Sequence, residues 1–249
     1  MLIKTKMKNL FYLITLINFI CFGQAKVKKD ICWDGFINNK IPIFIHYSIE
    51  DEVIIGEITY LNTKEKKPIK LIGTNNNENS YRLLEFDKKG NITGIIMVIP
   101  NSSELKGTWV STKTHKEMPL LAKKSKKVII STDNNPNLNK IFGDYHYSYG
   151  NLLWNGDLSI EKDSAKNIFF ELISLGKGKA PSIAQVKRSR IKLNRNSFIY
   201  KMPDSQNCRL KIIFFKDFVF VKNLGGDCSS EFGMGAYPEG IYLKITNTY

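Results

Sequence analysis

The feature that most constrains the fold of this chain is the alternation of apolar and polar residues along short runs. The run 41–49 places its large apolar residues on one face: Ile41, Ile43, Ile45, Tyr47 and Ile49. A period of two residues is typical of strands that bury one face. The run 53–61 repeats the pattern, and no segment has the period of a long amphipathic helix. The sequence therefore predicts an all-β protein.

Eight such runs follow one another closely in the first half of the chain. They cover 32–37, 41–49, 53–61, 67–73, 81–87, 91–99, 105–110 and 118–122. The separators are polar and contain the Asn, Gly, Pro and Ser residues that turns require. Closing such a meander into a small antiparallel barrel removes its exposed edges. We therefore expect a lipocalin- or calycin-like barrel domain at 26–123.

A second group of runs predicts a second domain of similar size. It comprises 144–149, 156–160, 167–175, 183–187, 190–193, 197–201, 208–215, 217–224 and 240–245. Between the groups, residues 124–140 are rich in Lys and Asn, which indicates a linker, with a short strand at 128–131. The expectation is two tandem barrels, the second at 141–249, each long enough for its own core.

The first 25 residues have the three parts of a secretory signal peptide. Three lysines precede an apolar core from Leu10 to Phe22, and Gly23, Gln24 and Ala25 form a small-residue exit. The core is shorter than the roughly 20 residues of a membrane span. We predict cleavage after Ala25, no transmembrane span after processing, and a secreted or periplasmic protein. The lesser alternative is a lipoprotein modified at Cys21.

The chain is strongly basic, with a net charge of +14. The predicted signal contains three lysines and no acidic residue, so its removal leaves +11. Such a charge favours anionic partners, and export makes these an envelope component or an acidic protein rather than nucleic acid. One run concentrates positive charge and is a candidate patch for an anionic partner: Lys187, Arg188, Arg190, Lys192 and Arg195. A solvated outer strand is the favoured interpretation of this run.

Three cysteines remain after the predicted cleavage, and two of them are expected to pair. The runs 208–215 and 217–224 predict a hairpin that brings Cys208 close to Cys228. Closing a loop of roughly 20 residues would stabilise the fold by about 3 kcal/mol. The remaining thiol, Cys32, is expected to be a small buried apolar residue.

Few residues suggest catalysis. His46, His115 and His146 lie in unrelated settings, so no metal or cofactor is expected. Glu85 and Asp87 stand two apart on one strand, about 7 Å from each other, and paired carboxylates can hydrolyse glycosidic bonds. The favoured interpretation is that both face solvent, with Leu84 and Phe86 on the buried face.

Two stretches of the chain carry a distinctive order of residues. The first contains Gly56, Tyr60, Gly73, Glu85, Thr93, Gly94, Gly107, Thr108 and Trp109 on successive strands. At these positions it resembles a module of uncharacterised secreted proteins of Gram-negative bacteria. The second, 208–215 with 227–228 and 232–244, is similar to a C-terminal module found in some proteins beside a lysozyme-inhibitor-type domain. Residues 229–232 depart from that pattern by separating the second cysteine from the glycine-rich turn. The resemblance implies export and carries little information about activity.

These observations favour an exported, non-enzymatic binding protein of the bacterial envelope or exterior, such as an inhibitor or a ligand carrier. Lysozyme inhibition is one concrete version of this hypothesis. Like charge opposes it, because lysozyme is usually basic and so is this chain. The alternatives are an envelope glycan hydrolase that uses Glu85 and Asp87, and a structural envelope component. Whether the barrels are hollow or packed would discriminate among them.

Overall fold

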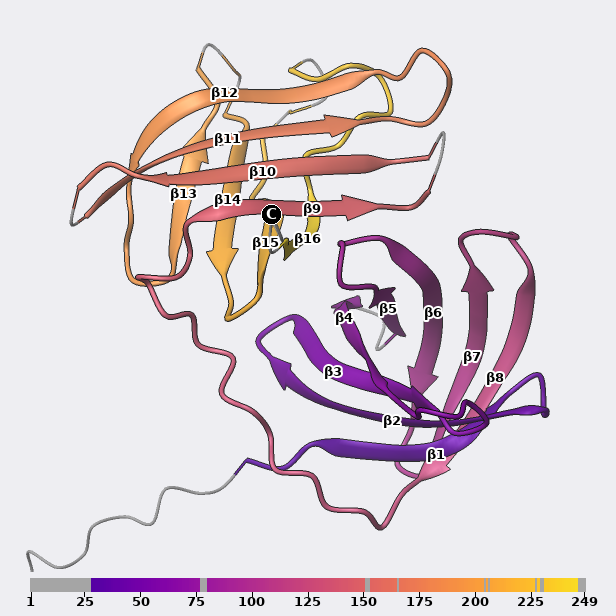
Figure 1. The fold of residues 1–249 in the computed structure, drawn as a ribbon. Helices are drawn as coiled ribbons and strands as arrows, with labels where there is room; N and C mark the ends of the chain where they lie inside the picture. Colours follow the sequence, from indigo (N-terminus) through magenta and orange to yellow (C-terminus); the bar gives the residue numbers. More distant parts are fainter. Residues whose placement is uncertain are drawn as a thin grey trace, which may run out of the picture.

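The computed structural model describes residues 28–76, 80–150, 153–164, 166–203, 205, 207–226, 228 and 231–245. The predicted signal peptide lies outside them. The described residues form two eight-stranded antiparallel sheets without helices, one closed into a barrel and one nearly closed (Figure 1). The predictions of an all-β chain and of barrel-like sheets are confirmed. No helix in this part of the chain is long and apolar enough to cross a membrane.

The first sheet is a closed meander in which each strand pairs with the next and β8 pairs with β1. Its strands are β1 (Ile31–Ile37), β2 (Ile41–Glu50), β3 (Val53–Tyr60), β4 (Pro68–Asn76), β5 (Ser80–Phe86), β6 (Ile92–Pro100), β7 (Glu104–Ser111) and β8 (Glu117–Lys124). All eight predicted runs form strands. Closure leaves no free edge in the described part of this sheet.

The second sheet has the order β12-β11-β10-β9-β16-β15-β14-β13, so β12 and β13 are its edges. Its strands are β9 (Gly143–Ser148), β10 (Asn155–Lys162), β11 (Asn167–Leu175), β12 (Ile183–Lys192), β13 (Ser197–Lys201), β14 (Arg209–Phe214), β15 (Phe218–Asn223) and β16 (Gly240–Lys244). The runs 183–187 and 190–193 are one strand, β12. A β-bulge sets two residues of β12 opposite Glu171. The extra residue shifts the alternation, which made one strand look like two.

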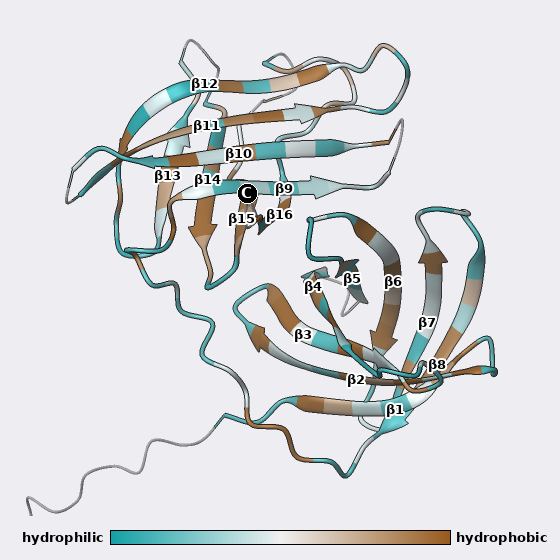
Figure 2. Cartoon of the chain, in the orientation of Figure 1, coloured by the Kyte–Doolittle hydropathy of each residue, from teal (hydrophilic) through white to brown (hydrophobic). Residues whose placement is uncertain are grey.

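The interior of the first barrel is filled by its own side chains. The apolar face predicted for 41–49 points inward, and Ile43, Ile45 and Tyr47 are buried there with Trp33 and Leu83. Hydrophobic and hydrophilic segments alternate along the strands of both sheets (Figure 2). Within the described residues, the core of this barrel is therefore packed.

A second hydrophobic cluster joins the two sheets. It contains the interior of the second sheet and also outward-facing residues of β3 to β6, namely Val53, Ile72, Leu84, Phe86 and Ile92. Across the contact, Lys70 Nζ lies 2.8 Å from Asp217 Oδ2, and Lys222 pairs with Glu52. The second sheet therefore covers one outer face of the first barrel.

The segment between β8 and β9 runs along both sheets. Asp30 N donates a hydrogen bond to Ile129 O, and Lys216 N donates one to Asn134 O, both at 2.9 Å. The expected strand at 128–131 is reduced to a single bridge between Lys29 and Ile130.

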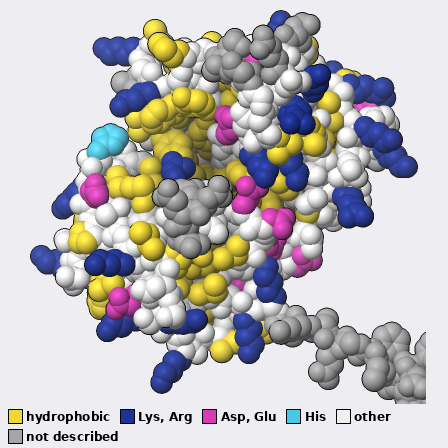
Figure 3. Space-filling model, turned by 180° about the vertical axis from the view of Figure 1, so that it is seen from behind, with side chains coloured by type: hydrophobic (Ala, Val, Ile, Leu, Met, Phe, Trp, Pro, Cys, Tyr) yellow, Lys and Arg dark blue, Asp and Glu magenta, His cyan; other side chains and the backbone are white. Residues whose placement is uncertain are grey.

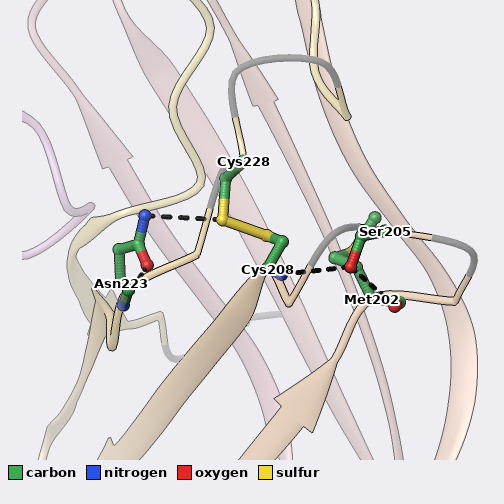
Figure 4. Close-up of a disulfide and its surroundings, with 6 residues drawn as sticks. Met202, Ser205, Cys208, Asn223 and Cys228 are labelled. Carbon is green, nitrogen blue, oxygen red and sulfur yellow. Dashed lines mark hydrogen bonds between the residues drawn. A yellow bond between two sulfur atoms is a disulfide. The ribbon is translucent and has the colours of Figure 1, made fainter.

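The predicted disulfide between Cys208 and Cys228 is present (Figure 4). It ties the start of β14 to the loop that follows β15. Asn223 Nδ2 lies 3.4 Å from the sulfur of Cys228, and Ser205 Oγ accepts a hydrogen bond from Cys208 N at 3.1 Å. The remaining thiol, Cys32, is buried, and burial raises its pKa. A disulfide fits an extracytoplasmic protein.

Candidate ligand-binding cleft

A cleft of about 680 Å³ lies between the two sheets. Figure 3 shows a hollow lined by hydrophobic side chains in this view of the molecule. The first barrel contributes the outer faces of β5, β6 and β7, and the second sheet contributes β9, β15 and β16. The volume falls within the roughly 300–1,000 Å³ typical of small-molecule sites.

The walls of the cleft are mainly apolar and aromatic. The apolar lining comprises Leu84, Ile92, Ile95, Val110, Leu153, Phe220, Val221 and Ile241. Three rings stand edge to face along one wall, because Tyr149 lies between Tyr147 and Trp154 at centroid distances of 5.9 and 6.4 Å. Such a wall offers both flat faces and polar ring edges to a ligand.

Arg82 is a half-buried cationic residue in the wall of the cleft. Leu83 points into the barrel, so its neighbours Arg82 and Leu84 point outward from β5 to the cleft. The half-buried guanidinium donates a hydrogen bond to Tyr149 Oη at 2.8 Å. No ion pair joins Arg82 to a carboxylate in the described part of the chain. Within those residues, its charge therefore has no carboxylate counter-ion.

Apart from tyrosines, the other ionisable groups of the described lining are two lysines, a histidine and Glu239, whose buried Oε2 has no hydrogen-bond partner in the described part of the chain. Lys222 is neutralised by Glu52, whereas Lys177 and His115 are exposed at the mouth. Glu239 is the one acidic residue in the described lining. The described lining therefore carries net positive charge, and Arg82 is its half-buried cation without a carboxylate partner among the described residues.

Tyr147 lines the cleft, and its hydroxyl is buried beside Ser174. Burial is the main cause that raises its pKa to about 12. Its hydroxyl therefore stays protonated at neutral pH, 2.9 Å from Ser174 Oγ.

The expectation that Glu85 faces solvent is wrong. Glu85 is 2% exposed and points into the first barrel, where Tyr60 Oη and Trp109 Nε1 donate hydrogen bonds to its Oε1 at 2.6 and 2.8 Å. Burial raises the pKa of this carboxyl. Leu84 and Phe86, expected to face the barrel core, are instead buried against the second sheet. Because both faces of β5 are covered, its alternation did not show which face points inward.

Asp87 has a separate structural role in the turn between β5 and β6. Its carboxylate accepts hydrogen bonds from the backbone N–H groups of Lys89 and Asn91 at 2.8 and 2.9 Å, and from Asn91 Nδ2 at 2.8 Å. The two carboxylates thus belong to different hydrogen-bond networks. The structure does not bring them together as an open acid pair.

Several of the residues that match the first resembling module lie around Glu85. Gly94 lies so close that a Cβ would stand 2.6 Å from both Glu85 Oε2 and Trp109 Nε1. At three other matching positions a Cβ would stand about 2 Å from a carbonyl oxygen on a neighbouring strand: Gly56 (2.0 Å), Gly73 (2.1 Å) and Gly107 (1.9 Å). Glycine permits this close approach where a barrel coils tightly. These positions therefore build the barrel and lie apart from the cleft.

The predicted basic patch lies on and beside the edge strand β12 and outside the cleft lining. Arg188 pairs with Glu161 at 2.6 Å and lies over the ring of Phe169, and Arg190 pairs with Asp163 at 2.8 Å. Lys187, Lys192 and Arg195 complete the set, and all five residues are exposed. Its two central guanidinium groups are thus already paired with carboxylates.

The histidines lie apart from one another. His46 Nδ1 lies 2.7 Å from Asp30 Oδ2, and His146 Nδ1 lies 2.7 Å from Asp157 Oδ1. His115 stands at the mouth of the cleft, in the turn between β7 and β8. Among the described residues, no three or more His, Cys, Asp and Glu side chains form a potential metal site.

No protein-family model matches the chain, and no curated protein or solved structure matches it. Sequence reasoning did not find Arg82, Tyr149 or Trp154. The available signal was an outer barrel face that is apolar on adjacent strands, as at Leu84 and Ile95, because such a face needs a cover.

Proposed function

We propose that this chain is an exported, non-enzymatic binding protein that takes a small amphipathic anion into the cleft between its sheets. The observation that carries the proposal is the half-buried guanidinium of Arg82, which among the described residues has a tyrosine hydroxyl but no carboxylate as partner. An anionic ligand would supply the missing charge.

The energetics favour an anion at Arg82. A charge withdrawn from water without a counter-ion is costly, and a ligand carboxylate or phosphate relieves that cost. The planar guanidinium can form two parallel hydrogen bonds to either group. The bond to Tyr149 restricts its orientation before a ligand arrives.

The remainder of the ligand is expected to be apolar. Beyond Arg82 the lining is mainly Leu, Ile, Val and aromatic side chains, and burying apolar surface there is the main source of affinity. The net charge of +11 that remains after the predicted cleavage also favours approach of an anion. The disulfide and the signal-like N-terminus support a site outside the cytoplasm.

A titration with ligands that differ only in their head group tests this proposal. Dodecanoate, dodecanol and dodecylamine share one apolar chain, so the head group decides their order of affinity. We expect dodecanoate to bind best and dodecylamine worst. Trp154 lines the cleft, so its fluorescence reports binding, and the Trp154→Phe variant identifies its share of the signal.

Two variants test the role of Arg82. Arg82→Met should lower dodecanoate affinity about tenfold or more, in line with a charged hydrogen bond, and should leave dodecanol affinity nearly unchanged. Arg82→Lys should retain part of the preference for the anion. Equal affinity of the wild-type protein for dodecanoate and dodecanol would contradict the proposal.

A further inference from the structure

We propose that the mouth of the cleft docks on the surface of an anionic phospholipid bilayer. The docking surface, called the apolar rim below, consists of Trp154, Ile183, Met234 and Tyr237 with Lys177 and Lys179. This inference rests on the proposed function in one respect: it names a membrane as the place where the cleft meets its amphipathic ligand.

The apolar rim exposes unusually large hydrophobic side chains. Met234 is 94% exposed and Tyr237 59%, while Ile183 and Trp154 are 49% and 38% exposed. Single exposed apolar residues are common, but a contiguous group indicates an interaction site. Trp154 and Tyr237 also line the cleft, so the rim is continuous with it.

Backbone hydrogen bonds hold these residues together. Gly233 N donates to Ile183 O at 3.0 Å, and Trp154 Nε1 donates to Gly235 O at 3.2 Å. The loop after β15 therefore lies beside the turn between β11 and β12 (Figure 1). Met234 lies between Gly233 and Gly235, whose backbone groups form these two hydrogen bonds. The fixed backbone on either side therefore keeps the Met234 side chain in solvent.

The composition of the rim matches an anionic bilayer. The two segments that form most of it, 176–183 and 233–238, contain two lysines and no acidic residue. Lys177 and Lys179 are both exposed. Trp and Tyr favour the interfacial region of membranes, apolar side chains insert below it, and lysines attract anionic head groups. An amphipathic anion leaving the bilayer would meet the lysines first and the apolar cleft behind them.

Vesicle sedimentation tests the inference. The purified protein is mixed with vesicles of phosphatidylcholine alone or of phosphatidylcholine with phosphatidylglycerol. We expect binding to the anionic vesicles, weakened by added salt, and little binding to the neutral ones. Met234→Ser should lower the partition coefficient about tenfold or more, because a fully exposed apolar side chain is lost. Lys177→Gln with Lys179→Gln should weaken binding and reduce its salt dependence.

Met97 supplies a matched control. It is 46% exposed on β6 of the first barrel and does not line the cleft. Met97→Ser should leave vesicle binding unchanged. Absence of binding to anionic vesicles, or an equal loss in Met97→Ser and Met234→Ser, would overturn the inference.

The cleft variant separates this inference from the proposed function. Arg82→Met should lose the preference for dodecanoate and keep vesicle binding, because Arg82 is not part of the apolar rim. If dodecanoate binds and vesicles do not, the membrane contact is wrong and the ligand site stands. If vesicles bind and dodecanoate does not, the ligand site is wrong and the membrane contact stands.

Discussion

Burial of Glu85 is expected to make the stability of the folded protein depend on pH. Its carboxyl has a raised pKa in the folded protein because burial disfavours the charge. In the unfolded chain the pKa is near its ordinary value of about 4.3. The folded state therefore binds more protons above that pH, so stability is lost as pH rises through the window up to the folded pKa.

Replacing Glu85 by Gln should remove this loss. The amide oxygen can still accept the hydrogen bonds of Tyr60 and Trp109, while no charge is buried. We expect Glu85→Gln to gain stability relative to wild type as pH rises above about 4, by about 1.4 kcal/mol for each unit of pKa shift. Urea unfolding between about pH 4 and about pH 7 measures this difference.

Glu85→Ala provides the contrast at this position. It leaves the Tyr60 hydroxyl and the Trp109 N–H buried without their acceptor. We expect it to destabilise the protein by about 2 kcal/mol or more near pH 4, and by less as pH rises, because only the wild-type protein then loses stability by burying a charge. A Gln variant as unstable as the Ala variant would show that the charge itself holds the network together.

At the scale of strands, alternation predicted much of the fold. All eight strands of the first barrel and the Cys208–Cys228 hairpin follow from local apolar periodicity and turn residues. Alternation did not assign the inner face of β5, because Leu84 and Phe86 are buried by the second sheet. It also could not find the cleft. Arg82, Tyr149 and Lys222 are far apart in sequence, and packing of the two sheets alone brings them to one site.

The disulfide joins the start of β14 to the loop that follows β15, and part of the apolar rim lies in that loop. Replacing both Cys208 and Cys228 by Ala should lower the free energy of unfolding by about 3 kcal/mol, because the unfolded chain regains the entropy of a loop of about 20 residues. Reductant should destabilise the wild-type protein similarly and leave the double variant unchanged. Cys32→Ala, which retains the disulfide, should remain sensitive to reductant. An insensitive wild-type protein would contradict the stabilising role of the bond.

At the scale of the whole molecule, apolar packing joins the two sheets more strongly than charge does. Lys70 and Asp217 are partly exposed, with side-chain exposures of 31% and 52%, and such pairs contribute at most about 1 kcal/mol. By contrast, Ile72, Leu84 and Ile92 of the first barrel are buried in a cluster shared with the second sheet. Since neither sheet can expose these residues without loss, the sheets should unfold together.

Calorimetry tests this coupling. We expect the wild-type protein to unfold in one transition whose calorimetric and van't Hoff enthalpies agree. Leu84→Asp places a charge in the shared cluster without touching the interior of the first barrel, so it should split the unfolding into two transitions and weaken ligand binding at the cleft. Leu121→Asp is the matched control, because Leu121 is 40% exposed on β8 and lies outside that cluster. It should keep a single transition. Two transitions in the wild-type protein would mean that the sheets are independent, and the cleft between them would then open and close without a large cost in stability.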